Sequence, residues 1–156
     1  MVKKRNILLV ILCFVVLFTL TGCFEATVKN TSDFKSLSER NKYTTSDVTS
    51  QYSADQNVKE ATVAKISEDS QIEFFVLKDE VSAGKMFITN KIKIDNGKSG
   101  SSSTSYSSNG PNYSTYSLSY SNKYMYICRV DNTLLYVKAL TEFKDNIKKF
   151  VKEFGY

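Results

Sequence analysis

Three strand-like segments joined by two-residue polar turns fill the C-terminal part of the chain and constrain its fold most strongly. The segments cover residues 113–120, 123–130 and 133–140 and are rich in aromatic and branched side chains. The turns between them are Ser121-Asn122 and Asp131-Asn132. Asn and Asp tolerate the positive φ angles that two-residue hairpin loops require. The pattern therefore predicts an antiparallel meander.

Further elements follow from hydrophobic periodicity. Residues 58–66 and 71–78 read as a second strand pair around a polar turn. Helical spacing predicts helices over residues 32–42, 80–91 and 141–154, and residues 44–50 resemble a brief edge strand. We therefore predict an α+β fold, in which two or three helices pack on an antiparallel sheet of about five to six strands as two layers.

Three of these segments show which faces should be buried. In the strand at 71–78, Ile72 and Phe74 share one face while Glu73 and Phe75 share the other, which suggests an inner strand covered at least partly on both sides. In the helix at 80–91 the helical stripe consists of Val81, Gly84, Ile88 and Lys91, and Gly84 would let the helix approach the sheet closely. The last helix has a clean apolar stripe and ends at Gly155, a residue typical of the position after a helix.

Residues 95–111 form a low-complexity segment rich in Ser and Gly. Such a composition buries too little apolar surface to offset the entropy of ordering, which favours a flexible crossover loop. A binding loop is the alternative, with Tyr106, Tyr113 and Tyr116 as adaptable aromatic contacts. The tyrosines of the following strands are open to the same two interpretations, because cross-strand tyrosine pairs also stabilise sheets.

The N-terminus carries an export pattern. Three cations at positions 3–5 precede an unbroken apolar run from Ile7 to Leu20. As a helix this run would extend about 21 Å, which is short for a bilayer core of about 30 Å. The segment therefore resembles the core of a signal peptide more than a permanent span.

The residues that follow, Leu20-Thr21-Gly22-Cys23, resemble the lipobox of bacterial lipoproteins. The resemblance implies cleavage between Gly22 and Cys23 and a thioether-linked diacylglycerol on Cys23, with or without a further N-acyl chain. It implies anchoring at the outer face of the cell membrane, and no other cofactor is expected. The implied organisation is a signal peptide at 1–22, a lipidated N-terminus and short tether at 23–30, and one α+β domain at 31–156. A secretory signal with an incidental cysteine is the alternative.

Cleavage would change the charge balance of the chain. Removing residues 1–22 leaves 134 of the 156 residues and takes away three cations and no acid, so the formal charge falls from +5 to +2. A charge this small gives no basis for nucleic acid binding, which usually depends on a dense basic face. We expect a monomer whose partners are the membrane, through the lipid, and an envelope protein or wall polymer.

The cysteine and histidine contents exclude several classes of chemistry. With Cys13 in the signal and Cys23 lipidated, Cys128 is left alone and forms no internal disulfide; its apolar surroundings predict a buried, inert thiol. The chain has no histidine, which excludes Ser-His-Asp and Cys-His arrangements and HExxH zinc sites. Catalysis by carboxylates alone remains open, with Asp79, Glu80 and Asp131 near the predicted loop ends.

Together these features favour a non-enzymatic, membrane-anchored binding or interaction domain outside the cytoplasmic membrane. The lipobox and the bias towards Lys, Asn, Ser, Ile, Phe and Tyr resemble those of small lipoproteins of low-GC Gram-positive bacteria. Two alternatives stay open. One is an immunity or envelope-stress protein that sequesters a toxin or lytic enzyme, and the other is a carboxylate-dependent enzyme acting on cell-wall glycans.

Overall fold

The computed structural model describes residues 25–98 and 102–156, so Gly22 and Cys23 lie outside the described part. The helices are α2 (Thr31–Arg40), α3 (Glu80–Asn96) and α4 (Lys144–Phe154), with 3-10 turns η1 (Thr49–Tyr52) and η2 (Thr141–Phe143). The strands are β1 (Thr44–Asp47), β2 (Val58–Ser67), β3 (Ser70–Leu77), β4 (Ser103–Asn109), β5 (Tyr113–Tyr120), β6 (Lys123–Val130) and β7 (Thr133–Leu140). The α+β class is confirmed. No helix among the described residues is long and apolar enough to span a membrane.

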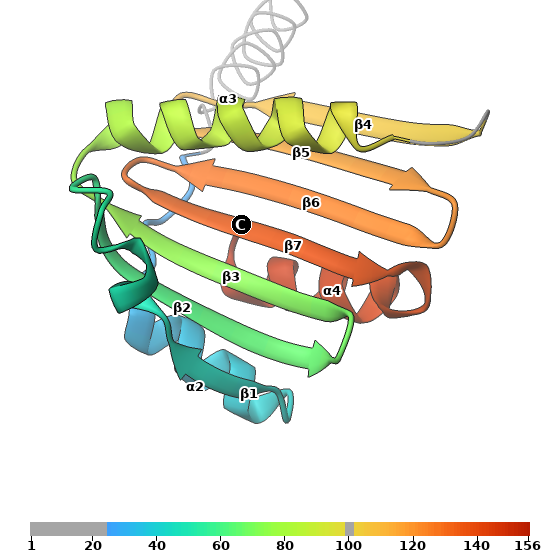
Figure 1. Cartoon of the computed structure of the whole chain (residues 1–156), viewed down its shortest axis with the longest axis horizontal. Helices are drawn as coiled ribbons and strands as arrows, with labels where there is room; N and C mark the ends of the chain where they lie inside the picture. Colours follow the sequence, from blue (N-terminus) through green and yellow to red (C-terminus); the bar gives the residue numbers. More distant parts are fainter. Residues whose placement is uncertain (1–24, 99–101) are drawn as a thin grey trace, which may run out of the picture.

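The strands form one open antiparallel sheet in the order β1-β2-β3-β7-β6-β5-β4 (Figure 1). Seven strands exceed the five to six that we predicted. The strand β7 lies in the middle because it pairs with β3 on one side and with β6 on the other. This placement joins the N-terminal hairpin to the C-terminal meander in a single sheet.

The predicted meander is confirmed, with β5, β6 and β7 at the expected residues. The two turns between them carry a residue with positive φ, 49° at Ser121 and 47° at Asp131. Short polar side chains tolerate this conformation better than branched ones. In the second turn this residue is the predicted Asp131, whereas in the first it is Ser121 instead of Asn122.

The extra strand is β4, and it corrects our interpretation of residues 95–111 as a flexible loop. Ser103–Asn109 pairs along its whole length with β5, and α3 runs on to Asn96 beyond the predicted end at Lys91. Most β4 side chains are exposed, so they contribute little apolar burial. The segment is ordered because its backbone pairs with the edge of β5, which would otherwise be open. The amino-acid composition of the segment does not indicate this pairing.

Helices cover both faces of the sheet, which gives three layers and corrects the two-layer prediction. In Figure 1, α3 crosses the front of the sheet while α2 and α4 lie behind it. Two separate apolar clusters result. Phe74 belongs to the cluster under α2 and α4, and its neighbour Phe75 belongs to the cluster under α3. The three layers follow from strands that are apolar on both sides.

The last helix packs as its periodicity predicted. Ile147, Phe150, Val151 and Phe154 are all buried, and Gly155 follows the helix with φ 89°. The positive φ places Gly155 in the left-handed region, where the lack of a Cβ avoids steric cost. The backbone N–H of Gly155 donates to the Val151 carbonyl at 3.1 Å, which helps to close the helix end.

The helix α3 turns a different stripe towards the sheet from the one we predicted. Ala83 and Ile94 are buried, whereas Val81 and Ile88 are 66% and 58% exposed. A Cβ added to Gly84 would meet nothing within 4 Å, so this glycine does not mark a close approach. The error arose because Ala83 and Ile94 alone carry too weak a pattern for periodicity to identify.

The free space at Gly84 leads to a stability prediction. Gly84→Ala should raise the free energy of unfolding by about 0.5–1 kcal/mol, because alanine loses less backbone entropy in a helix interior. Gly155→Ala, at φ 89°, should instead lower it by about 1–2 kcal/mol. Chemical denaturation of both variants checks the pair. A destabilised Gly84→Ala protein would contradict the open packing around this helix.

Candidate ligand-binding cleft

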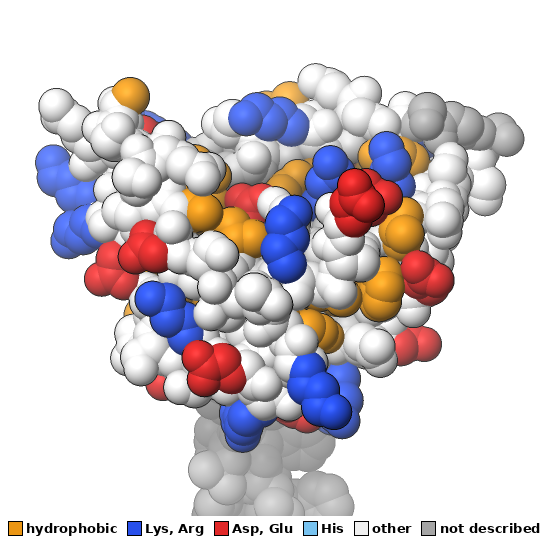
Figure 2. All heavy atoms as spheres, turned by 60° about the horizontal axis from the view of Figure 1, so that its bottom comes forward, with side chains coloured by type: hydrophobic (Ala, Val, Ile, Leu, Met, Phe, Trp, Pro, Cys, Tyr) orange, Lys and Arg blue, Asp and Glu red, His pale blue; other side chains and the backbone are white. Residues whose placement is uncertain are grey.

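A cleft with a volume of about 540 Å³ lies between α3 and the sheet. Strands β3 and β7 form its floor, α3 forms one wall, and η1 with the loop before β2 forms the other. Figure 2 looks onto this side and shows apolar side chains in a hollow flanked by basic and acidic ones. The lining residues are Tyr52, Asp55, Asn57, Glu73, Phe75, Leu77, Ser82, Lys85, Met86, Thr89, Asn90, Lys93 and Tyr136. We call this cavity the α3 cleft.

A chain of hydrogen bonds orders the loop wall of the cleft. The Asp55 carboxylate accepts from the backbone N–H of Asn57 at 3.0 Å and from its Nδ2 at 2.9 Å. The Ser82 hydroxyl then donates to Oδ1 of Asn57 at 3.3 Å, which connects the loop to α3. The Asn57 carbonyl also accepts from the backbone of Lys78 at 2.8 Å. The loop is therefore held to both neighbouring elements.

The floor of the cleft carries a partly buried acid, Glu73. Its Oε1 accepts from Nε2 of Gln71 at 2.5 Å, and on the same face of β3 it is followed by the buried Phe75. Burial raises the pKa of the Glu73 carboxyl, against the opposing effects of Gln71, Lys65 and Lys138. An acid held where its charged form is disfavoured is a feature that functional sites share.

Two tyrosines stand beside this acid. Tyr136 is paired directly with Glu73 across β3 and β7, and burial raises the pKa of its phenol to about 12. Burial likewise raises the pKa of Tyr52, whose ring meets Phe75 edge-on at 5.2 Å. Both phenols stay protonated at neutral pH and can donate or accept hydrogen bonds.

The position of Glu73 predicts a pH-dependent stability. Because its folded pKa lies above the ordinary value of 4.5, the folded state loses stability as pH rises through the interval above 4.5. Glu73→Gln lacks this penalty, so its stability relative to the wild type should increase between about pH 4 and about pH 7. Denaturation of both proteins at the two pH values tests this. A constant difference would show that the carboxyl is not desolvated.

The three tyrosines proposed for a binding loop do not come together. Tyr106 is 70% exposed on the edge strand β4, whereas Tyr116 is buried on the face covered by α3. Tyr113 packs against the opposite cluster, and its ring lies so close to Gly110 that an added Cβ would clash with it. Tyr116 therefore lies on the opposite sheet face from Tyr113 and, by the β4–β5 register, from Tyr106, so the three tyrosines do not form one surface.

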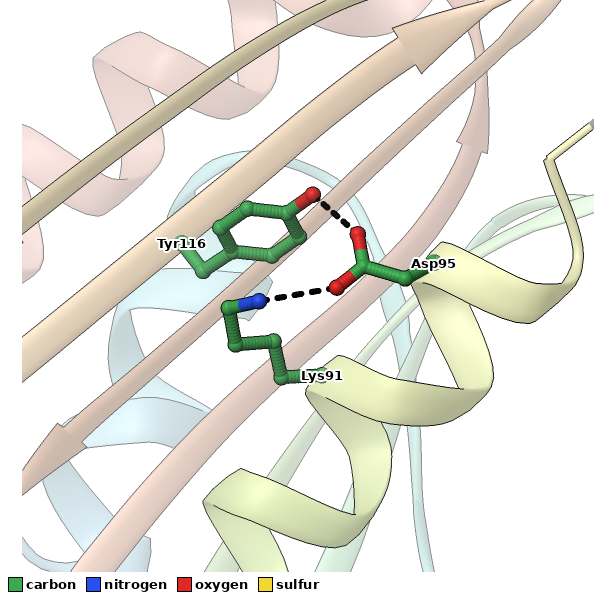
Figure 3. Close-up of polar contacts among 3 residues, drawn as sticks. All are labelled: Lys91, Asp95 and Tyr116. Atoms are coloured by element: carbon green, nitrogen blue, oxygen red, sulfur yellow. Dashed lines mark hydrogen bonds and ion pairs between the residues drawn. The ribbon is translucent and has the colours of Figure 1, made fainter.

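Tyr116 is instead part of a polar contact that fastens α3 to the sheet (Figure 3). Its hydroxyl donates to Oδ1 of Asp95, and Nζ of Lys91 donates to Oδ2 at 2.8 Å. The Lys91 ammonium also lies 4.4 Å from the centre of the Tyr116 ring. Burial, followed by the bond to Asp95, raises the pKa of Tyr116 to about 12. We interpret this cluster as structural.

The other residues that the sequence analysis named are a buried thiol, a helix cap, a turn residue and an exposed acid. Cys128 is buried at 1% exposure, as predicted, and burial raises the pKa of its thiol to about 12. Asp79 caps α3 by accepting from the backbone N–H of Ser82 at 2.8 Å. Asp131 accepts from Nδ2 of Asn112 at 3.1 Å in the β6–β7 turn. None of these residues, nor the exposed Glu80, lines the α3 cleft.

A second cavity of about 370 Å³ lies on the other face, between the end of α4 and strands β4 to β6. It is mainly apolar and borders Ala26, which is fixed to the domain by Asn112. No group of three or more Cys, Asp or Glu side chains among the described residues is arranged to hold a metal ion. Of these two cavities, the α3 cleft has more charged and polar lining residues.

Sequence reasoning did not identify this cleft. One signal was present, because Glu73 is an acid that shares one face of an inner strand with Phe75 and Leu77. Its companions Tyr52, Asn57 and Lys93 come from three separate elements, and nothing local relates them. Comparisons with protein-family models, curated proteins and solved structures found no match to this chain.

Proposed function

We propose that this chain is a membrane-anchored extracytoplasmic lipoprotein whose domain binds a small ligand in the α3 cleft without chemically transforming it. The observation that carries the binding role is the cleft itself. Its volume of about 540 Å³ falls in the range of small-molecule sites. Its apolar floor around a partly buried Glu73 is the combination of burial and selective polarity that such sites use.

The anchoring part of the proposal rests on the lipobox and agrees with how the N-terminal segment is held. Two hydrogen bonds join the backbone of Ala26 to the Asn112 side chain, at 3.0 and 2.8 Å. Only Phe24 and Glu25 separate Ala26 from Cys23. Three residue steps reach about 10 Å, so a lipid on Cys23 would keep the domain against the membrane. The ligand would then come from the space next to the membrane surface, from an envelope protein or a wall polymer.

The anchor has a direct test. Cys23→Ala should leave an unprocessed precursor and abolish the hydrophobic retention due to the lipid, because two acyl chains supply stable membrane attachment. Detergent-phase partitioning and the size of the product measure both effects. Cys128→Ala is the matched control and should be processed normally, because its thiol is buried inside the domain. A mature-sized Cys23→Ala product that still partitions into detergent would contradict lipid attachment.

The binding role is tested by screening the full-length protein, extracted in detergent, against a library of small fragments by amide NMR. Shifts that cluster on residues of β3, β7 and α3 around the cleft are expected. Hits confined to other surfaces would overturn the assignment. Incubation with wall polymers addresses the non-enzymatic part, since released fragments would overturn it in favour of a carboxylate enzyme.

A further inference from the structure

The charged residues of the α3 cleft are separated by sign. Both bases, Lys85 and Lys93, lie on the helical wall formed by α3. Both acids lie on the other side, Glu73 on the β3 floor and Asp55 on the loop wall. The two lysines are eight residues apart, or about 12 Å along the helix. A ligand in the cleft therefore faces positive charge on one side and negative charge on the other.

The charged residues of the cleft form no salt bridge with other described residues of the protein. The salt bridges among the described residues are Lys91–Asp95 and Lys149–Glu153, and neither includes a charged residue of the cleft. Lys65 and Lys138 act on Glu73 from neighbouring strands, but they are exposed and do not contact it. An acid that is partly removed from water without a paired cation is costly, and a cationic ligand group would offset that cost.

Apolar side chains also line the cleft, next to uncharged polar ones such as Thr89 and Asn90. Phe75 and Leu77 are buried residues of the floor, and Met86 contributes a flexible thioether from α3. The rings of Tyr52 and Tyr136 complete this middle zone. The surface therefore suits a ligand with an apolar centre and polar ends, and methionine adapts readily to different shapes.

We propose that the α3 cleft binds a zwitterionic ligand, a short peptide with free termini, whose ammonium group meets Glu73 and Asp55 and whose carboxylate meets Lys85 and Lys93. This inference rests on the cleft being the binding site proposed above. The apolar middle zone takes the side chain of the ligand. A ligand of one charge sign would be attracted by one wall and repelled by the other, so opposite charges at its two ends fit best.

Calorimetric titration of the full-length protein in detergent with the tripeptide Ala-Leu-Ala tests the inference. The N-acetylated and the C-amidated forms serve as matched probes that each lack one charge. We expect each modification to weaken binding about tenfold or more, because it leaves charged groups of the cleft without their partner. Glu73→Gln should remove the preference for the free amine, and the double variant Lys85→Gln/Lys93→Gln the preference for the free carboxylate. Glu39→Gln and Lys148→Gln, exposed outside the cleft, should change neither.

The possible outcomes distinguish an error in the proposed class of ligand from an error in the proposed binding site. Equal binding of capped and free peptides, with amide shifts still in the cleft, would overturn the zwitterionic ligand and leave the cleft as a binding site. Fragment hits in the cleft together with no binding of any peptide form would also overturn the ligand class. An empty cleft in both experiments would overturn the site itself. Chemical denaturation of Glu73→Gln in the titration buffer shows whether the variant is folded, so that a loss of binding can be separated from unfolding.

Discussion

Phe74→Ala should lower the free energy of unfolding by about 3–5 kcal/mol, the range found when a large buried aromatic is truncated. Phe74 is 1% exposed at the centre of an aromatic cluster. Its ring stacks on Phe34 at 5.4 Å, meets Phe154 edge-on at 5.4 Å and contacts Tyr156 at 6.4 Å. These partners come from α2, α4 and the C-terminal residue, so the loss would loosen both helices together.

Chemical denaturation followed by circular dichroism measures this effect. Tyr106→Ala is the matched control, because it removes an aromatic ring that is 70% exposed and should change the free energy by less than about 0.5 kcal/mol. A similar small loss for Phe74→Ala would mean that the helices of this layer collapse to fill the cavity. It would contradict the tight three-way packing of β3, α2 and α4.

Asn112→Ala should release the N-terminal segment from the domain and lower stability by about 2 kcal/mol. The side chain makes three hydrogen bonds, two with the backbone of Ala26 and one with the carboxylate of Asp131. Each such bond contributes about 0.5–1.5 kcal/mol. Ala26 is the residue at which the chain from Cys23 is fixed to the domain. Releasing it would therefore lengthen the flexible connection between the proposed lipid and the domain.

Hydrogen exchange reports this release directly. The Ala26 amide should exchange at least about tenfold faster in Asn112→Ala, since its acceptor is gone, while amides in β6 and β7 keep most of their protection. Asn109→Ala removes an exposed asparagine for which the structure shows no side-chain hydrogen bond and should leave Ala26 unchanged. Unaltered exchange at Ala26 in Asn112→Ala would show that other contacts fix the segment.

The elements predicted correctly are those whose signals are local. The strands β5 to β7 are bounded by turns whose residues tolerate positive φ, and α4 is defined by a single stripe that ends in Gly155. In both cases the residues that specify the element lie within it or next to it. The lipobox is a local signal of the same kind, and the lipidation of Cys23 that it implies stays a prediction.

The errors concern interactions between distant segments. The segment that contains β4 has the composition of a loop, and it is ordered because its backbone completes the edge of β5. In α3 the exposed residues Val81 and Ile88 are larger than the buried Ala83, so the pattern indicated the wrong face. Propensity and periodicity are weak where backbone pairing and packing decide the outcome.

By itself, the sequence determined the meander, the strand pair before it and the closing helix, because turn chemistry and hydrophobic periodicity act over a few residues. It also predicted from its apolar neighbours that Cys128 is buried. The tertiary structure decided the three layers, the seventh strand and the α3 cleft. The cleft joins Glu73 on the floor to Lys93 on a helix and Asp55 on a loop, and only the crossing of α3 over the sheet brings such distant residues together.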